Sequence, residues 1–108
     1  KKEEILMGFH KYTFPIRQIE ATGEPIKVVT GWANEDYTIG FHKVYKDKRW
    51  AATDLYTGTY YTVQDTRQKC LDWIAAHQDI VKEKMESPAY IQRVMEFKRL
   101  LEKEMEEL

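Results

Sequence analysis

The feature that most constrains the fold of this chain is a change in side-chain period at Gln64. Before this residue, apolar side chains recur at every second position, as in Tyr12, Phe14 and Ile16, which is the pattern of half-buried strands. After it, they recur at spacings of three and four, which is the pattern of amphipathic helices. The sequence therefore predicts an α+β fold, with an antiparallel sheet over residues 10–64 followed by helices.

Turn signals divide the first part of the chain into short strands. Gly23 and Pro25 mark one break, and Thr57-Gly58 fits a tight hairpin loop. Short loops join antiparallel neighbours, so we expect a meander of four or five strands. In the run 50–56, the pattern shows neither face as plainly buried. The expected strands cover residues 12–16, 26–32, 37–45, 50–56 and 59–63.

Two helices are expected after the sheet. The first covers 65–85, with Asp65 or Thr66 as its N-cap and an apolar stripe that includes Cys70 and Ile74. The second covers 88–107, because Ser87-Pro88 supplies a cap and a proline at the first helical position. We expect both helices to pack on one face of the sheet, which makes residues 1–108 a single domain.

Charge and composition narrow the class of protein. The chain has 108 residues, with 17 basic and 18 acidic side chains and a formal net charge of -1, so it lacks the global charge of a non-specific polyanion binder. Its one cysteine cannot form an internal disulfide, which favours a reducing, cytoplasmic setting. No apolar run is long enough for a membrane span. Because the first residue is Lys1 and not Met, removal of a leader peptide before it stays an open alternative.

No group of residues has the spacing of a catalytic or metal site. Cys70 shares a helical stripe with apolar residues, which predicts a small core residue rather than a nucleophile. His10, His42 and His77 lie far apart in the chain and lack the short spacing of zinc ligands. Asp54 stands among apolar strand residues, where an exposed position or an Asp-mediated turn is expected. We therefore predict a protein without catalytic activity, metal or cofactor.

The segment 42–50 is the strongest candidate for a binding surface, because it combines basic side chains with aromatic rings in a strand-turn-strand unit. Tyr and Trp exposed on a rigid sheet are typical of protein-binding hot spots, which favours a protein partner. The alternative is a nucleic-acid-binding module that uses the same hairpin, with cations on phosphates and rings on bases. The predicted partner-binding residues are Lys43, Tyr45, Lys46, Lys48, Arg49 and Trp50.

The last helix is a third candidate surface. Its apolar stripe includes Phe97, Leu101 and Met105 and reaches the final residue. Packing of this stripe on the same domain is favoured, while homodimerisation through it stays open.

One part of the chain carries a resemblance. The strand Trp50-Ala51-Ala52-Thr53, the Thr57-Gly58 turn and the helix opened by Thr66-Arg67 and continuing through Leu71 resemble small accessory proteins of bacteriophages and mobile elements. The resemblance covers about a quarter of the chain. It implies a binder or inhibitor that acts on host machinery, including nucleic-acid-targeting defence complexes.

Overall fold

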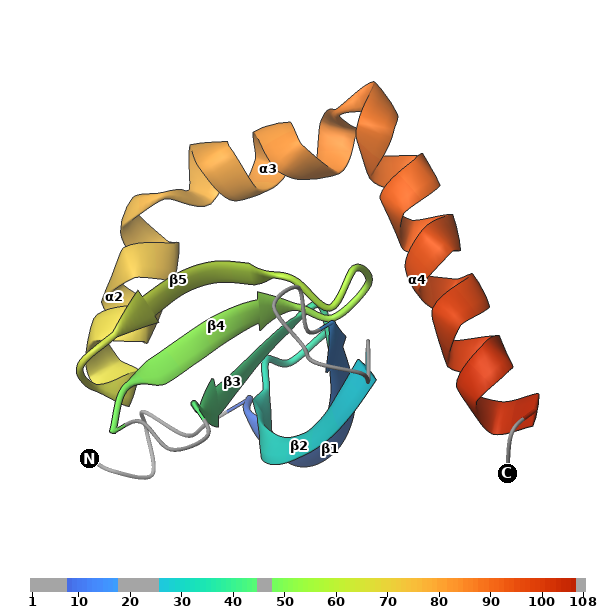
Figure 1. Ribbon diagram of the computed structural model, residues 1–108. Helices are drawn as coiled ribbons and strands as arrows, with labels where there is room; N and C mark the ends of the chain where they lie inside the picture. Colours follow the sequence, from blue (N-terminus) through green and yellow to red (C-terminus); the bar gives the residue numbers. More distant parts are fainter. Residues whose placement is uncertain (1–7, 18–25, 45–47, 107–108) are drawn as a thin grey trace.

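A computed structural model describes residues 8–17, 26–44 and 48–106 of the chain. Five antiparallel strands form one sheet in the order β1-β2-β3-β4-β5, and three helices follow it (Figure 1). The predicted α+β class and meander topology are therefore confirmed. The strands are β1 (His10–Arg17), β2 (Ile26–Ala33), β3 (Ile39–Lys43), β4 (Trp50–Asp54) and β5 (Tyr60–Gln64); the helices are α2 (Arg67–Ala76), α3 (Gln78–Glu86) and α4 (Pro88–Glu106).

The helices form an arch over the sheet. Figure 1 shows α2 beside β4 and β5, α3 crossing above, and α4 descending on the other side. A hydrophobic cluster fills the space between α2, α3 and one face of the sheet, which we call the helix face. Because Cys70 lies in this cluster and is fully buried, its predicted role as a core residue is confirmed. The buried members are Ile39, Phe41, Ala52, Cys70, Ile74 and Val81.

The prediction of a single helix over 65–85 was wrong, because the structure divides this segment into α2 and α3 at His77. The His77 ring stacks on Trp73 with centroids 4.1 Å apart, and its Nδ1 lies 2.7 Å from the Trp73 carbonyl oxygen. The His77 side chain thus contacts a backbone carbonyl of α2. The backbone angles of His77, φ -122° and ψ 35°, lie outside helical values. The turn redirects the chain, so that α3 crosses the sheet.

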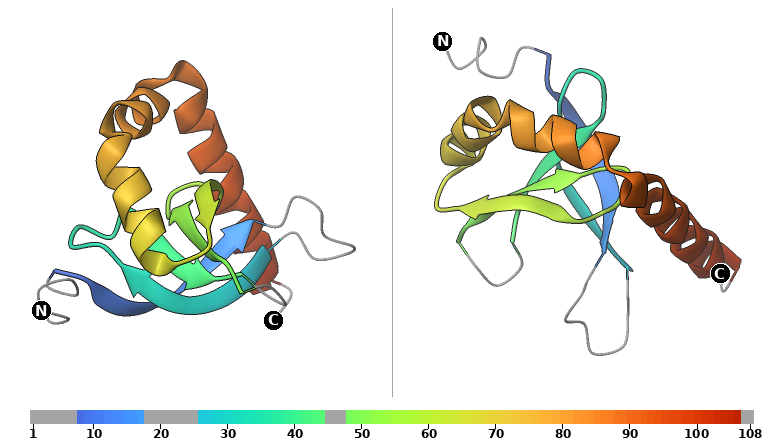
Figure 2. Two further views of the ribbon diagram at one scale, coloured as in Figure 1. Left: turned by 90° about the vertical axis from the view of Figure 1, so that its left-hand side faces the viewer. Right: turned by 90° about the horizontal axis from the view of Figure 1, so that it is seen from above.

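The opposite face of the sheet, which we call the inner face, is covered by the sheet itself. β1 and β3 are not neighbours, yet the rings of Phe14 and His42 lie 5.8 Å apart. Gly40 lets the strands come this close, because a Cβ there would stand 2.7 Å from the Phe14 ring. The sheet is therefore strongly curled, as both views in Figure 2 show. Both faces of β4 are buried as a result, which the sequence pattern did not indicate.

α4 divides into a packed face and an exposed face. Phe97 is 2% exposed and packs on the β4–β5 loop, where a Cβ on Gly58 would lie 2.6 Å from its ring. Gly58 has φ +71°, a conformation that favours glycine. Ile91 lies on the exposed face, with 68% of its surface open to solvent. No helix among the described residues is long and apolar enough to cross a membrane.

Candidate functional site

The structure brings basic and aromatic side chains together at the end of the sheet where β4 begins. Lys43 of β3 and Trp50 of β4 are direct cross-strand partners, so they share the helix face. Lys43, Lys48 and Arg49 are exposed, and Trp50 is half-buried against the hydrophobic cluster. The predicted binding residue Trp50 is thus also a core residue. Tyr45 and Lys46 lie outside the described residues.

Two residues that the sequence did not assign complete this group. Trp32 of β2 reaches the helix face through its pairing with Phe41. Arg67 is the first residue of α2, and its guanidinium carbon lies 6.0 Å from the Trp32 ring centroid and 5.7 Å from that of Trp50. These distances fit cation–π contacts to both rings. We call this group the basic-aromatic end. Its members are Trp32, Lys43, Lys48, Arg49, Trp50 and Arg67.

The start of α2 adds to the positive potential of this end. Thr66 caps the helix by accepting a hydrogen bond from the Lys69 N–H, and no acidic residue lies in the first turn. The N-terminus of a helix carries a partial positive charge, which Arg67 and Lys69 increase. Asp65 offsets part of it through an exposed ion pair with Lys69 at 3.7 Å. The positive potential at the start of α2 is favourable for a nearby anionic group.

The other end of β4 is closed. Asp54 is 1% exposed, although the sequence predicted exposure or a turn bond. The turn bond is present, because the Tyr56 N–H donates to Asp54 Oδ1 at 2.9 Å, whereas the exposure was wrong. The Tyr90 hydroxyl from α4 donates to the same oxygen at 3.1 Å. Lys84 Nζ from α3 lies 3.3 Å from Oδ2, so the buried carboxylate has a charged partner.

The tyrosine hydroxyls around Asp54 are held in the protonated form. Burial, the Asp54 charge and the hydrogen bond to Asp54 raise the pKa of the Tyr90 hydroxyl, so Tyr90 stays a donor. Burial and the Asp54 charge likewise raise the pKa of Tyr61. Lys84 also donates to Thr59 Oγ1 at 3.1 Å and lies 4.5 Å from the Tyr61 ring centroid. We call Asp54, Lys84 and Tyr90 the clasp, because they join the β4–β5 loop to α3 and α4.

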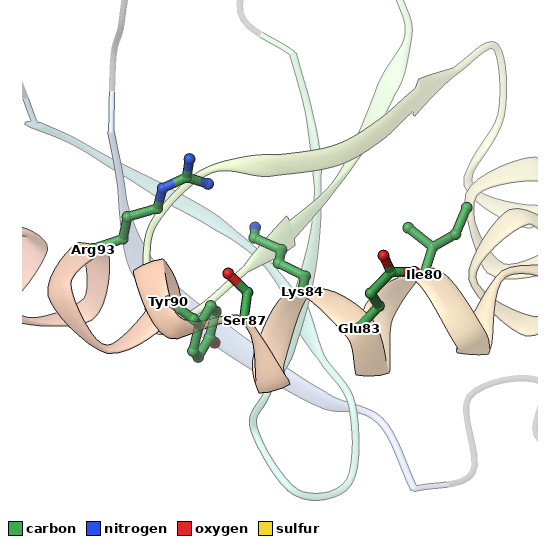
Figure 3. Close-up of a pocket in the computed structure, with 6 residues that line it drawn as sticks. All are labelled: Ile80, Glu83, Lys84, Ser87, Tyr90 and Arg93. Atoms are coloured by element: carbon green, nitrogen blue, oxygen red, sulfur yellow. The ribbon is translucent and has the colours of Figure 1, made fainter.

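A shallow groove of about 320 Å³ lies beside the clasp, between α3 and α4. Figure 3 shows Lys84, Ser87 and Arg93 on its walls. Ser87 accepts a hydrogen bond from the Ala89 N–H at 3.3 Å, as expected for a cap of α4. Asp54 does not line the groove. The carboxylate is therefore not placed to act on a molecule bound there.

The remaining candidates for chemistry are separated in space. Burial raises the pKa of the Cys70 thiol, whose Sγ lies 3.3 Å from the Trp50 carbonyl oxygen. A raised pKa disfavours the nucleophilic thiolate. His10 stacks on Tyr37, His42 is buried on the inner face, and His77 contacts Trp73. Within residues 8–17, 26–44 and 48–106, no three His, Cys, Asp or Glu side chains are grouped to hold a metal ion.

The residues expected on a dimer helix are only partly accessible. Phe97 is buried within its own chain, in agreement with the favoured intramolecular packing. Leu101 is half-buried, and the side chain of Met105 lies outside the description. Phe97 is therefore not available to a second copy in this structure.

No protein-family model matches this chain, and neither the curated proteins nor the solved structures gave a match.

Proposed function

We propose that this chain is a non-enzymatic binding protein that captures an acidic segment of a partner protein through its basic-aromatic end. The observation that carries the proposal is the position of Arg67 against both Trp32 and Trp50, next to the exposed cations Lys43 and Lys48. Arg67 is held by ring contacts, which lowers the entropy it would lose on binding a carboxylate.

A protein partner is favoured over nucleic acid by the same contacts. Bases bind single-strand proteins by stacking on free aromatic faces. Here the guanidinium of Arg67 lies over both tryptophan rings, and both rings are only half exposed. The net charge of -1 also disfavours binding through phosphates alone. By occupying the surface of its partner, the chain would act as an adaptor or inhibitor, in line with its resemblance to accessory proteins of bacteriophages and mobile elements.

Capture from a lysate of the native host, followed by mass measurement of the retained proteins, tests this proposal. The bait is compared with the variant Lys43→Gln/Lys48→Gln/Arg67→Gln. The control Lys82→Gln/Lys98→Gln removes two exposed charges from α3 and α4. We expect the first variant to lose the retained protein and the control to keep it. Equal retention by all three baits would show that the basic-aromatic end does not bind the retained protein.

A salt titration separates the two classes of partner. Binding of a glutamate-rich peptide and of a single-stranded oligonucleotide is measured on the same protein. We expect saturable binding of the peptide and only weak, strongly salt-dependent binding of the oligonucleotide. Tighter binding of the oligonucleotide that persists at physiological salt would favour the nucleic-acid alternative.

A further inference from the structure

A second surface, separate from the basic-aromatic end, lies where β1 starts and the β2–β3 turn ends. Three exposed rings lie there, and two of them, His10 and Tyr12, contact the third, Tyr37. His10 stacks on Tyr37 with centroids 4.8 Å apart and planes 7° apart, and Tyr12 meets Tyr37 at 5.1 Å and 70°. Tyr12 is 39% exposed and Tyr37 is 42% exposed. His10 covers one face of Tyr37, and the parts of Tyr12 and Tyr37 that remain exposed form a corner of aromatic surface.

The β2–β3 turn holds Tyr37 in a fixed position. Tyr37 has φ +57°, the only positive φ at a non-glycine residue in the described part of the chain. Its N–H donates to the Asn34 carbonyl at 3.0 Å. Asn34 Oδ1 accepts from the N–H groups of Thr38 and Ile39 at 2.8 and 2.9 Å, and its amide nitrogen donates to Thr38 Oγ1 at 2.8 Å. The ring of Tyr37 is therefore presented by a rigid turn.

The charge at this corner is opposite in sign to that of the basic-aromatic end. Glu35 and Asp36 are the central residues of the turn and are both exposed. Asp36 Oδ1 accepts from Thr38 Oγ1 at 2.8 Å, which fixes the carboxylate at the tip. No basic residue lies between Asn34 and Thr38. Aromatic faces and carboxylates both attract cations, and here they are adjacent in the chain.

We propose that this corner, formed by Tyr12, Tyr37, Glu35 and Asp36, binds an arginine side chain of a partner protein. A guanidinium group is planar, so it can lie against an aromatic ring while its N–H groups pair with a carboxylate. An ammonium group can approach a ring but cannot stack on it in this way. The site is independent of the proposed capture of an acidic segment, because it shares no residue with the basic-aromatic end.

The test uses capped tripeptides with arginine, citrulline or lysine between two glycines. Binding is followed by chemical-shift changes of the Tyr12 and Tyr37 rings and of the 35–37 amides. We expect saturable shifts with the arginine peptide and about tenfold weaker binding of the other two. Equal shifts with citrulline would show that charge is not recognised and would overturn the proposal. Binding of lysine as tight as arginine would overturn the assignment to arginine.

Variants separate loss of binding from loss of fold. In Tyr37→Gly the ring is lost while the positive φ becomes favourable, so we expect a thermal midpoint close to that of the wild type and about tenfold weaker binding of the arginine peptide. The matched control is Tyr56→Ala, which removes another exposed tyrosine, on the β4–β5 loop, and should leave binding unchanged. Unchanged binding in Tyr37→Gly, or an equal loss in Tyr56→Ala, would contradict the proposal.

Discussion

Charged side chains are buried at one end of β4 and exposed at the other. At Asp54 a carboxylate is buried and meets a lysine from α3 and a hydroxyl from α4. At Trp50, four residues earlier in an otherwise buried strand, the cations of Lys43 and Lys48 face solvent. The charge at the closed end is paired within the chain, whereas the two lysines at the open end are exposed to solvent. We infer that substitutions at the closed end reduce stability and those at the open end reduce binding.

Removal of the clasp should have the largest effect. In Asp54→Ala, Lys84 loses its partner while its ammonium stays mostly buried, and the Tyr56 N–H and Tyr90 hydroxyl lose their acceptor. We expect the free energy of unfolding to fall by about 3–5 kcal/mol, measured by urea denaturation. The matched control is Asp65→Ala, which breaks an exposed ion pair and should cost under about 1 kcal/mol. Equal losses in both variants would refute the role of the clasp.

Acid should lower the free energy of unfolding through His42, which is buried on the inner face. Burial, aided by the charge of Lys27, lowers the pKa of His42 from 6.5 to about 4, so folding favours the neutral ring. Its contribution is complete above the unfolded pKa of 6.5 and is lost as the pH falls towards about 4, because the unfolded chain takes up the proton first. The lowered pKa corresponds to a contribution of about 3 kcal/mol to the free energy of unfolding.

The measurement for this prediction is the unfolding free energy at several pH values in the wild type and in His42→Gln. The wild type should lose more stability than the variant between about pH 7 and about pH 4, because only the wild type carries the titrating ring. Parallel pH profiles of the two proteins would contradict this assignment.

The contact between the β4–β5 loop and α4 gives a smaller effect. In Gly58→Ala the new Cβ would lie 2.6 Å from the Phe97 ring and 2.9 Å from the Arg17 nitrogen, at φ +71°. We expect a loss of about 2 kcal/mol in urea denaturation. Gly8→Ala is the control, because its φ of +83° is similar but its nearest contact is 3.6 Å. If Gly8→Ala cost as much, backbone strain alone would explain the loss.

The smallest effect on stability is expected at the open end. Lys43→Gln/Lys48→Gln changes two exposed side chains, so the unfolding free energy should stay within about 0.5 kcal/mol of the wild type. Binding of a glutamate-rich peptide should nevertheless weaken. A stability loss as large as that of Asp54→Ala would show that these lysines support the fold and would remove the contrast between the two ends.

The sequence predicted the elements better than their arrangement. The change of period at Gln64 is confirmed, since β5 ends there and Thr66 caps α2. Ser87-Pro88 starts α4 as expected. The break at His77 was missed because it has neither glycine nor proline; it accompanies a contact of the His77 ring with a backbone carbonyl, which periodicity does not report.

The sites were harder to predict than the elements because their partners are distant in the sequence. Asp54 has only apolar and small neighbours in the chain, while Lys84 and Tyr90 come from two later helices. Arg67 is recognisable in the sequence only as a residue at the start of a helix, because its contact with Trp32 depends on the register of β2 and β3. Lys43, Lys48 and Trp50 belong to one expected hairpin, so the sequence alone could place these three residues near one another.

The most direct test of the contrast between the two ends is a two-dimensional NMR titration of the labelled chain with a glutamate-rich peptide. We predict saturable shifts of the indole N–H groups of Trp32 and Trp50 and of the Lys43 and Arg67 amides, with the amides around Asp54 unchanged. Shifts centred on Asp54, or no saturable shift at Trp32 and Trp50, would contradict the account.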